Sequence, residues 1–290
     1  MFTVIDRQRK TLEGHFGEVT ALRFLVDSDK LVSGSINGEV LLWDVDDATL
    51  LHRFDGHLSR ITGLAITLRD EEILGSSLEG HTLYWKIPKQ RGGHGPTVVQ
   101  SSHTYPENGK HLGVQVTSDD GLVVIPTQSN ITIYNLGTQA RIVGLIEHSR
   151  GVKDLCVSSD NRFIASCGGD NAIFLMPLSE NKVAARYKGH TKSVHALDLH
   201  PSDEQLASGG LDGTIRIWNT VKHKLVKLIR TFNDTVLSVK YSSDGCLLAA
   251  ASMDSSLGIF NTVDWQLLQR VHSQGAWASN YSHVFINKNT

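Results

Sequence analysis

A period of 42 residues runs through most of this chain and limits the folds that it can adopt. The residues that end short alternating runs recur at this spacing: Trp43, Trp85, Tyr134, Met176, Trp218 and Phe260. Every step is 42 residues except the step from Trp85 to Tyr134, which is 49. A fixed spacing of this size is typical of repeat architectures, in which each repeat is one supersecondary unit.

Two other sets of residues keep the same register. Pairs ending in histidine stand near the start of four units: Gly14-His15, Gly56-His57, Glu147-His148 and Gly189-His190. Turn residues precede the six aromatic or apolar positions: Asn37, Glu79, Gln128, Asp170, Asp212 and Asp254. The seven additional residues of the long step fall around residues 88–96, PKQRGGHGP, where the Gly and Pro content predicts an extended surface loop.

Each unit alternates apolar and polar residues with the two-residue period of β-strands. In the fifth unit, the runs VHALDL, QLASGG, TIRIWN and KLVKLI are separated by turn residues and predict four short antiparallel strands. An apolar stripe with helical periodicity is absent from the sequence. We therefore expect an all-β repeat protein.

A repeat of this length, with GH near one end and WD near the other, resembles the WD-repeat β-propeller family. The resemblance is strongest in residues 189–219 and 14–44 and extends over nearly the whole chain. It implies one propeller domain over residues 1–290. The expected repeats are 14–55, 56–96, 97–146, 147–188, 189–230 and 231–271, with residues 272–290 and 1–13 forming a partial closing blade.

The resemblance also implies a hydrogen-bonded tetrad of His, Ser or Thr, Asp and Trp that locks the turns of each blade. Matched by position, the fifth unit is complete, with His190, Ser208, Asp212 and Trp218. Other units are partial: His148, Ser166 and Asp170 with Met176 in the fourth, His15, Ser33, Asn37 and Trp43 in the first, and His57 and Trp85 with Gly75 and Glu79 in the second. The third and sixth units retain little of the set.

The number of blades follows from counting. Residues 8–12 align with an outermost strand, although residues 265–271 already supply that strand to the sixth unit. The simplest interpretation is a seven-bladed plan with an incomplete last blade, built from the N-terminal strand and residues 276–286. The alternative is six blades and an additional strand. An incomplete blade leaves strand edges that a partner chain could complete by donating a strand.

The resemblance implies that partners bind the face carrying the loops before the innermost strand and before the turn acid. Large apolar residues precede the turn residue in four units: Ile36, Leu78, Leu211 and Met253. Early positions of the innermost strands add Arg60, Lys153, His195 and Leu237. These positions are open to two interpretations, packing within the ring or contact with a partner, and the basic side chains would favour an acidic or phosphorylated peptide.

Catalytic and metal-binding patterns do not emerge from the sequence. His190, His195 and His200 recur every five residues, a spacing that places neighbours on opposite faces of a strand. The segment GGHGP at 92–96 lacks the following Lys-Ser/Thr of a phosphate-binding loop. We therefore expect no enzyme activity, no cofactor and no metal site.

The expected function is a non-catalytic scaffold that organises a multiprotein complex through other proteins or short peptides. Two alternatives stay open: a substrate receptor of a cullin-type ubiquitin ligase, and an assembly factor in an RNA-processing or ribosome-biogenesis complex. The net charge of −2 argues against direct nucleic-acid binding. Three widely spaced cysteines and the polar segment MFTVIDRQRK predict a cytoplasmic or nuclear protein with no membrane span.

Overall fold

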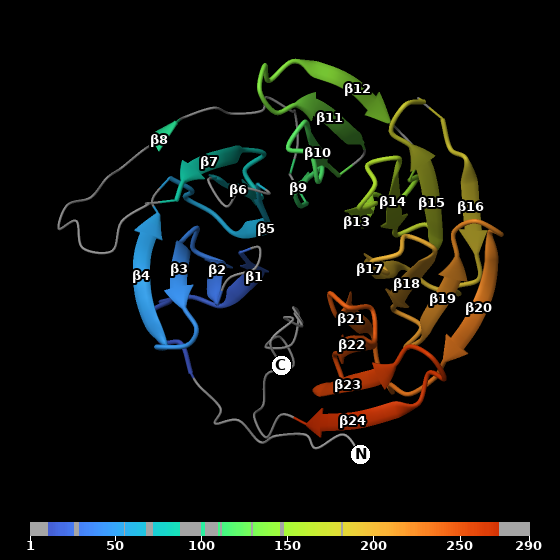
Figure 1. Cartoon of the computed structure of the whole chain (residues 1–290). Coiled ribbons are helices and arrows are strands. Elements are labelled where there is room, and N and C mark those ends of the chain that lie inside the picture. The colour runs from blue at the N-terminus through green and yellow to red at the C-terminus, as the bar shows by residue number, and fades with distance from the viewer. Residues whose placement is uncertain are drawn as a thin grey trace.

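The computed structural model describes residues 11–25, 29–54, 56–67, 72–87, 100–101, 110, 112–128, 130–145, 148–180 and 182–272. These residues form six antiparallel sheets of four strands, arranged around a central axis as the blades of a propeller (Figure 1). The strands of each blade follow one another in sequence from the axis to the rim. The prediction of an all-β propeller is confirmed.

The strands of the six blades have the following bounds. Blades 1 and 2 comprise β1 (Val19–Phe24), β2 (Lys30–Ser35), β3 (Val40–Asp44), β4 (Thr49–Phe54), β5 (Ile61–Ile66), β6 (Glu72–Ser77), β7 (Thr82–Lys86) and β8 (Gln100–Ser101). Blades 3 and 4 comprise β9 (Gln115–Val116), β10 (Leu122–Pro126), β11 (Ile131–Asn135), β12 (Arg141–Leu145), β13 (Val152–Val157), β14 (Phe163–Gly168), β15 (Ala172–Pro177) and β16 (Ala185–Lys188). Blades 5 and 6 comprise β17 (Val194–Leu199), β18 (Gln205–Gly210), β19 (Ile215–Asn219), β20 (Lys224–Ile229), β21 (Val236–Tyr241), β22 (Leu247–Ser252), β23 (Ser256–Asn261) and β24 (Leu267–His272).

Blade 5 shows how directly the sequence pattern specifies the strands. Its four strands coincide with the runs predicted from alternation, except that the third begins one residue later, at Ile215. Two buried faces explain the pattern of the second strand, whose residues 206–210 are all buried because a sheet inside the ring is covered on both sides. The predicted loop at 88–96 lies outside the described residues.

The hydrophobic core is divided into layers between neighbouring blades. Each of the five successive seams, from blades 1 and 2 to blades 5 and 6, is filled by a single cluster that contains side chains of both blades. At the seam between blades 5 and 6, for example, Ile215 and Ile217 pack against Val236, Val239 and Phe260. Burial of apolar area at these seams supplies most of the stabilisation of a fold built from thin sheets.

The seam between blades 6 and 1 differs from the other five. Blade 1 contributes the cluster of Leu31, Leu41 and Trp43, whereas blade 6 contributes a separate cluster of Ala249 and Ala251. Among the described residues, neither cluster contains a side chain of the opposite blade. The described residues thus form the six blades of the sequence alternative, and residues 1–10 and 273–290, assigned above to a partial closing blade, lie outside them.

Candidate partner-binding face

The tetrad of blade 5 forms a continuous hydrogen-bonded chain from the rim side of the blade to a tight turn. Trp218 Nε1 donates to Ser208 Oγ over 2.9 Å, and Ser208 Oγ lies 2.8 Å from His190 Nε2. His190 Nδ1 lies 3.0 Å from both carboxylate oxygens of Asp212. These contacts are consistent with one order of donors, in which the Ser208 hydroxyl donates to His190 Nε2 and the Nδ1–H of His190 donates to the Asp212 carboxylate.

Asp212 also holds the backbone of two adjacent turns. Its carboxylate accepts bonds from the Thr191 and Thr214 amides, at 2.9 and 3.2 Å, and from Thr214 Oγ1 at 2.7 Å. Burial alone would raise the pKa of this carboxyl, but the bonds from His190, Thr214 and Thr191 outweigh it and lower the pKa below the ordinary value. The loops at 190–193 and 211–214 are therefore fixed to one another.

The partial tetrad of blade 4 keeps the same polar half. His148 Nδ1 lies 2.8 Å from Asp170 Oδ1, and His148 Nε2 lies 3.0 Å from Ser166 Oγ. Met176, which stands at the tryptophan position, is completely buried and offers no N–H donor. The ring of Phe174 instead packs on the histidine, with ring centroids 4.5 Å apart.

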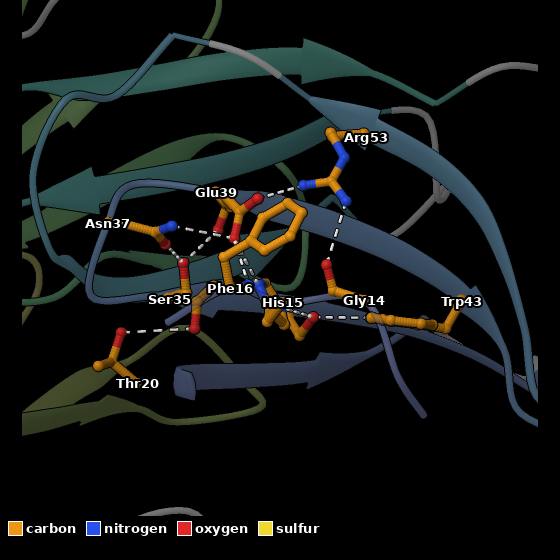
Figure 2. Close-up of polar contacts among 11 residues, drawn as sticks. Gly14, His15, Phe16, Thr20, Ser35, Asn37, Glu39, Trp43 and Arg53 are labelled. Atoms are coloured by element: carbon orange, nitrogen blue, oxygen red, sulfur yellow. Dashed lines mark hydrogen bonds and ion pairs between the residues drawn. The ribbon is translucent and has the colours of Figure 1, made fainter. Parts of the chain in front are cut away.

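In blade 1 the acidic position of the network has moved by two residues. Asn37 makes no bond to His15; it bonds Ser35 and donates to Glu39 Oε2 over 3.2 Å. Glu39 takes the acidic role, accepting from the Phe16 amide at 3.1 Å and lying 3.4 Å from His15 Nδ1 (Figure 2). Glu39 stands at the position that Thr214 occupies in blade 5, and its side chain is long enough to reach His15 from there.

An arginine of the outermost strand completes this modified network, which the sequence patterns did not indicate. Arg53 pairs with Glu39, donates to the Gly14 carbonyl over 3.1 Å and lies over the Phe16 ring, 5.6 Å from its centroid (Figure 2). Arg270 has the equivalent position in blade 6, ten residues after the aromatic. It contacts Asp254 and Ser256 and lies over the Phe232 ring.

Blades 2 and 6 replace the polar chain in two different ways. In blade 2, Gly75 removes the hydroxyl, and His57 Nε2 instead donates to the Gly75 carbonyl over 2.8 Å. The Trp85 ring fills the vacated space, since a Cβ on Gly75 would lie 2.7 Å from it. In blade 6, an edge-to-face pair of Phe232 and Phe260 stands at the histidine and tryptophan positions.

Comparison with known families decides the identity of the fold. A sequence model of the WD domain, G-beta repeat family matches residues 6–44, 140–175, 181–219 and 226–261, which is just over half of the chain. The chain belongs to the WD-repeat family. No curated protein matches the chain significantly. The unmatched stretch between residues 44 and 140 holds most of WD repeats 2 and 3, where the tetrad has lost its serine and aspartate.

The tetrads of this WD-repeat propeller stabilise one face of the ring, which we call the tetrad face and define by the loops 14–18, 57–60, 148–151, 190–193 and 232–235 and the turns 36–38, 78–80, 169–171, 211–213 and 253–255. A backbone bond joins turn to loop in five blades, as from the Leu211 amide to the Ser193 carbonyl, with lengths of 2.8–3.0 Å. The bond donor is the residue before the turn acid. Each of the predicted apolar residues on this face is thus held beside a loop.

The predicted apolar residues on the tetrad face differ in exposure. Ile36, Leu211 and Met253 are exposed, at 43%, 41% and 46%, whereas Leu78 is half-buried. Two apolar side chains that the sequence patterns did not single out, Phe16 and Leu58, are more exposed than these, at 88% each. They directly follow the histidines of blades 1 and 2. Their common register position is a signal that could have identified them.

Three of the four remaining predicted residues, Lys153, His195 and Leu237, lie around the axis of the ring. A cavity of about 190 Å³ on this axis is lined by residues of all six blades, including Lys153, His195 and Leu237. These three are bulged residues, skipped in the pairing of the innermost strand with the second, as Thr20 and Thr62 are. A bulge redirects a side chain, and here it occurs at the same register position in five blades. Arg60 is exposed on the loop of blade 2.

Charged residues of both signs also lie at the cavity, since Arg23, Asp154 and Lys240 are among its lining residues. Lys240 contacts Asp198 with its ammonium group 2.5 Å from Oδ1, and Asp198 Oδ2 accepts from the Tyr241 amide. Asp154 accepts from the Leu197 amide at 2.9 Å, and burial raises its pKa to about 6 although Lys240 opposes the shift. Burial, and then the charge of Lys153, lower the pKa of His195.

Two further properties concern only the residues that the structure describes. Among them, no group of three or more His, Cys, Asp or Glu side chains is placed to hold a metal ion. None of their elements is a helix long and apolar enough to span a membrane.

Proposed function

We propose that this WD-repeat propeller is a non-catalytic scaffold that binds protein partners through its tetrad face. WD-repeat propellers are typically protein-interaction scaffolds and generally lack catalytic activity. The observation that carries the proposal is the group of exposed apolar side chains on the fixed loops and turns of this face: Phe16, Ile36, Leu58, Leu211 and Met253. Exposed apolar residues gathered on one face are characteristic of interaction surfaces.

Phe16 has the properties of an anchor residue. Its side chain is 88% exposed, yet Glu39 holds its amide and Arg53 lies against its ring. A pre-positioned aromatic ring loses little conformational freedom when a partner covers it, which is why aromatic residues dominate binding energetics at interfaces.

The axial cavity supports a finer proposal about the ligand. Lys153 and His195 lie at the cavity, and Arg60 is exposed on the same face. An acidic or phosphorylated peptide would find charge-assisted hydrogen-bond donors there, between apolar contacts at the surrounding turns. Burial lowers the pKa of His195, so its ring is neutral at neutral pH, and the charge that it would gain on protonation in acid would strengthen binding of such a peptide.

Affinity purification with mass spectrometry tests the proposal. The wild-type chain is compared with Phe16→Ser, Leu211→Asp and Met253→Asp on the tetrad face. Val221→Asp and Val263→Asp serve as matched controls, because these valines are 71% and 89% exposed on the loops of the opposite face. We expect partners to be lost with the first group and retained with the controls.

The thermal midpoint of each variant separates a binding surface from the interior. Exposed positions should change the midpoint little, because their side chains already contact water. If Leu211→Asp and Met253→Asp unfold the protein, these side chains are interior and the tetrad face is not the binding surface. Partners retained by all three tetrad-face variants would equally contradict the proposal.

The same purification separates the two alternatives. Cullin and its adaptors among the partners would support a ubiquitin-ligase receptor, and partners lost after ribonuclease treatment would support an RNA-processing assembly factor. We further propose that the protein works in the cytoplasm, the nucleus or both. Support comes from the two buried cysteines, Cys156 and Cys167, which are unpaired as expected in a reducing compartment.

A further inference from the structure

Positive charge gathers on the rim of blade 5. Residues 213–233, which form β19, β20 and the turns beside them, contain five of the 28 Lys and Arg residues of the chain and none of its 30 Asp and Glu residues. The remainder of the chain carries 23 Lys and Arg against 30 Asp and Glu. Four of the five cations lie on β20 or directly beside it, and all four are exposed: Lys222, Lys224, Lys227 and Arg230. The net charge of −2 therefore conceals a local excess of positive charge.

The four cations of this rim are unpaired within the described part of the chain. None of them forms an ion pair or a side-chain hydrogen bond with a described residue. In blade 1, by contrast, Arg53 of the outermost strand pairs with Glu39 of its own blade. The equivalent residue of blade 5 is Leu228, and the acid of that blade, Asp212, is already bonded within its tetrad. The cations of β20 are therefore available to an anion outside the chain.

Two exposed apolar side chains lie between the lysines of β20. Leu225 and Val226 are 43% and 51% exposed. Val226 is a bulged residue, because Leu225 pairs with Trp218 and Lys227 with Ile217, which leaves Val226 without a partner in β19. A bulge redirects a side chain, and this one leaves an aliphatic group exposed between cations. We call the following six residues the basic rim: Lys222, Lys224, Leu225, Val226, Lys227 and Arg230.

Protection of a sheet edge explains only part of this surface. Strand β20 lies on the perimeter of the ring, where it pairs with β19 alone among the described strands (Figure 1). Lysines and bulges on an outermost strand prevent unwanted pairing with other sheets. Lys222 and Arg230, however, lie outside the strand. The exposed pair of Leu225 and Val226 favours association, so edge protection does not account for it.

The composition of the basic rim favours an acidic protein segment over other polyanions. The Phe, Tyr and Trp residues within 213–233 are Trp218 and Phe232, and both are buried, so the bases of a single-stranded nucleic acid find no such ring to stack on. A bilayer or a nucleic-acid duplex extends beyond the rim and would be repelled by the acidic remainder of the chain. A short peptide contacts the rim alone, and about six extended residues match the 20 Å or so that β20 spans.

We propose that the basic rim is a second interaction surface, which binds an extended acidic segment of a protein partner whose carboxylates alternate with apolar side chains. Carboxylates bind Lys224 and Lys227, with Lys222 and Arg230 at the two ends, while apolar side chains cover Leu225 and Val226. The basic rim shares no residue with the tetrad face. The ring can therefore hold two partners, or two parts of one partner, at the same time.

Fluorescence anisotropy with a defined probe tests this proposal. The probe is a labelled peptide of about ten residues in which Glu and Leu alternate. A single-stranded oligothymidylate of equal length and phosphatidylserine vesicles are the competitors. We expect the wild-type chain to bind the peptide and the two competitors to displace it poorly. Absence of peptide binding, or tighter binding of either competitor, would overturn the proposal.

Charge reversal on β20 locates the binding site. Lys224→Glu combined with Lys227→Glu should weaken peptide binding at least about tenfold, because two attractive contacts become repulsive. Glutamine at both positions should weaken binding less than glutamate does. Lys86→Glu combined with Lys110→Glu changes the net charge equally at exposed positions elsewhere, and this control should retain most of the binding. An equal loss in the control would assign the effect to net charge and contradict a site on the rim.

The apolar part of the basic rim has its own matched control. Val226→Asp should weaken peptide binding, whereas Leu268→Asp should not, although Leu268 is the bulged residue of β24 in blade 6 and is 58% exposed. Thermal midpoints of both variants should stay close to that of the wild type, because both side chains already contact water. Equal peptide binding by Val226→Asp and the wild type would show that the rim is not the site.

Other variants distinguish the basic rim from the tetrad face. Phe16→Ser and Lys153→Glu alter the tetrad face and the axial cavity, and both should leave peptide binding unchanged. A loss with Lys153→Glu, together with full binding by the variants of β20, would place the acidic segment at the cavity and overturn the rim as its site. Partner capture by the tetrad face should in turn be independent of Lys224 and Lys227, so the two proposals can fail separately.

Discussion

Replacing Asp212 with alanine tests whether the blade 5 tetrad stabilises the ring. The carboxylate accepts four hydrogen bonds, from His190 Nδ1, Thr214 Oγ1 and the amides of Thr191 and Thr214. His190 and Thr214 are only 6% and 8% exposed, so water cannot readily replace the lost acceptor. Thr191 is exposed, and its amide can bond water instead.

The expected loss of stability follows from three donor groups on the two buried residues, namely the His190 ring N–H and the hydroxyl and amide of Thr214. Each unpaired buried donor costs roughly 1–3 kcal/mol, so the three donor groups together cost about 3 kcal/mol at the lower end of that range. We expect Asp212→Ala to lower the free energy of unfolding by about 3 kcal/mol. Asp212→Asn keeps an oxygen acceptor for His190 and should cost about half as much.

Chemical and thermal denaturation measure both variants. Because the folded pKa of Asp212 lies below its ordinary value, its contribution is complete above about pH 4 and is lost as the pH falls through the folded pKa. The alanine variant should therefore lose part of the acid dependence of the wild type. An unchanged unfolding midpoint for Asp212→Ala would refute the role of the tetrad.

Three further perturbations test other parts of the structure by denaturation. Glu39→Ala should cost about 1–2 kcal/mol because it removes the acceptor for the Phe16 amide and His15, whereas Asn37→Ala should change little; equal effects would contradict the exchanged roles. Wild-type stability should decline as the pH rises from about 4 to 6, because the folded Asp154 carboxyl keeps its proton up to a pKa of about 6 and the unfolded one does not. Asp154→Asn should abolish this decline; a decline that persists in the variant would belong to another group. Ile217→Ala, at a filled seam, should cost about 3 kcal/mol and Ile259→Ala clearly less; equal costs would mean that both seams are filled.

The candidate site was only partly predictable from the sequence. Residues that keep the repeat register, such as Ile36, Leu211 and Met253, can be placed on one face because the register fixes their position in the blade. Phe16 was not identified, although its position directly after the histidine repeats in Leu58, and Glu39 was not identified because its role depends on contacts between a loop and a turn. Asn37 stands at the turn position that is an aspartate in blades 4 and 5. Glu39 supplies the acid instead because its longer side chain reaches His15 from two residues further along the chain.

The sequence by itself determined the repeat, the four-stranded unit and the WD-repeat fold, because these follow from periodicity and from local turn chemistry. Only the tertiary structure decided which seams are filled. Burial at a seam depends on side chains of two different blades, and no single repeat encodes both sides. Ile217 and Ile259 occupy the same position in consecutive repeats, yet one is fully buried and the other is not. The difference comes from what stands opposite each of them across the seam.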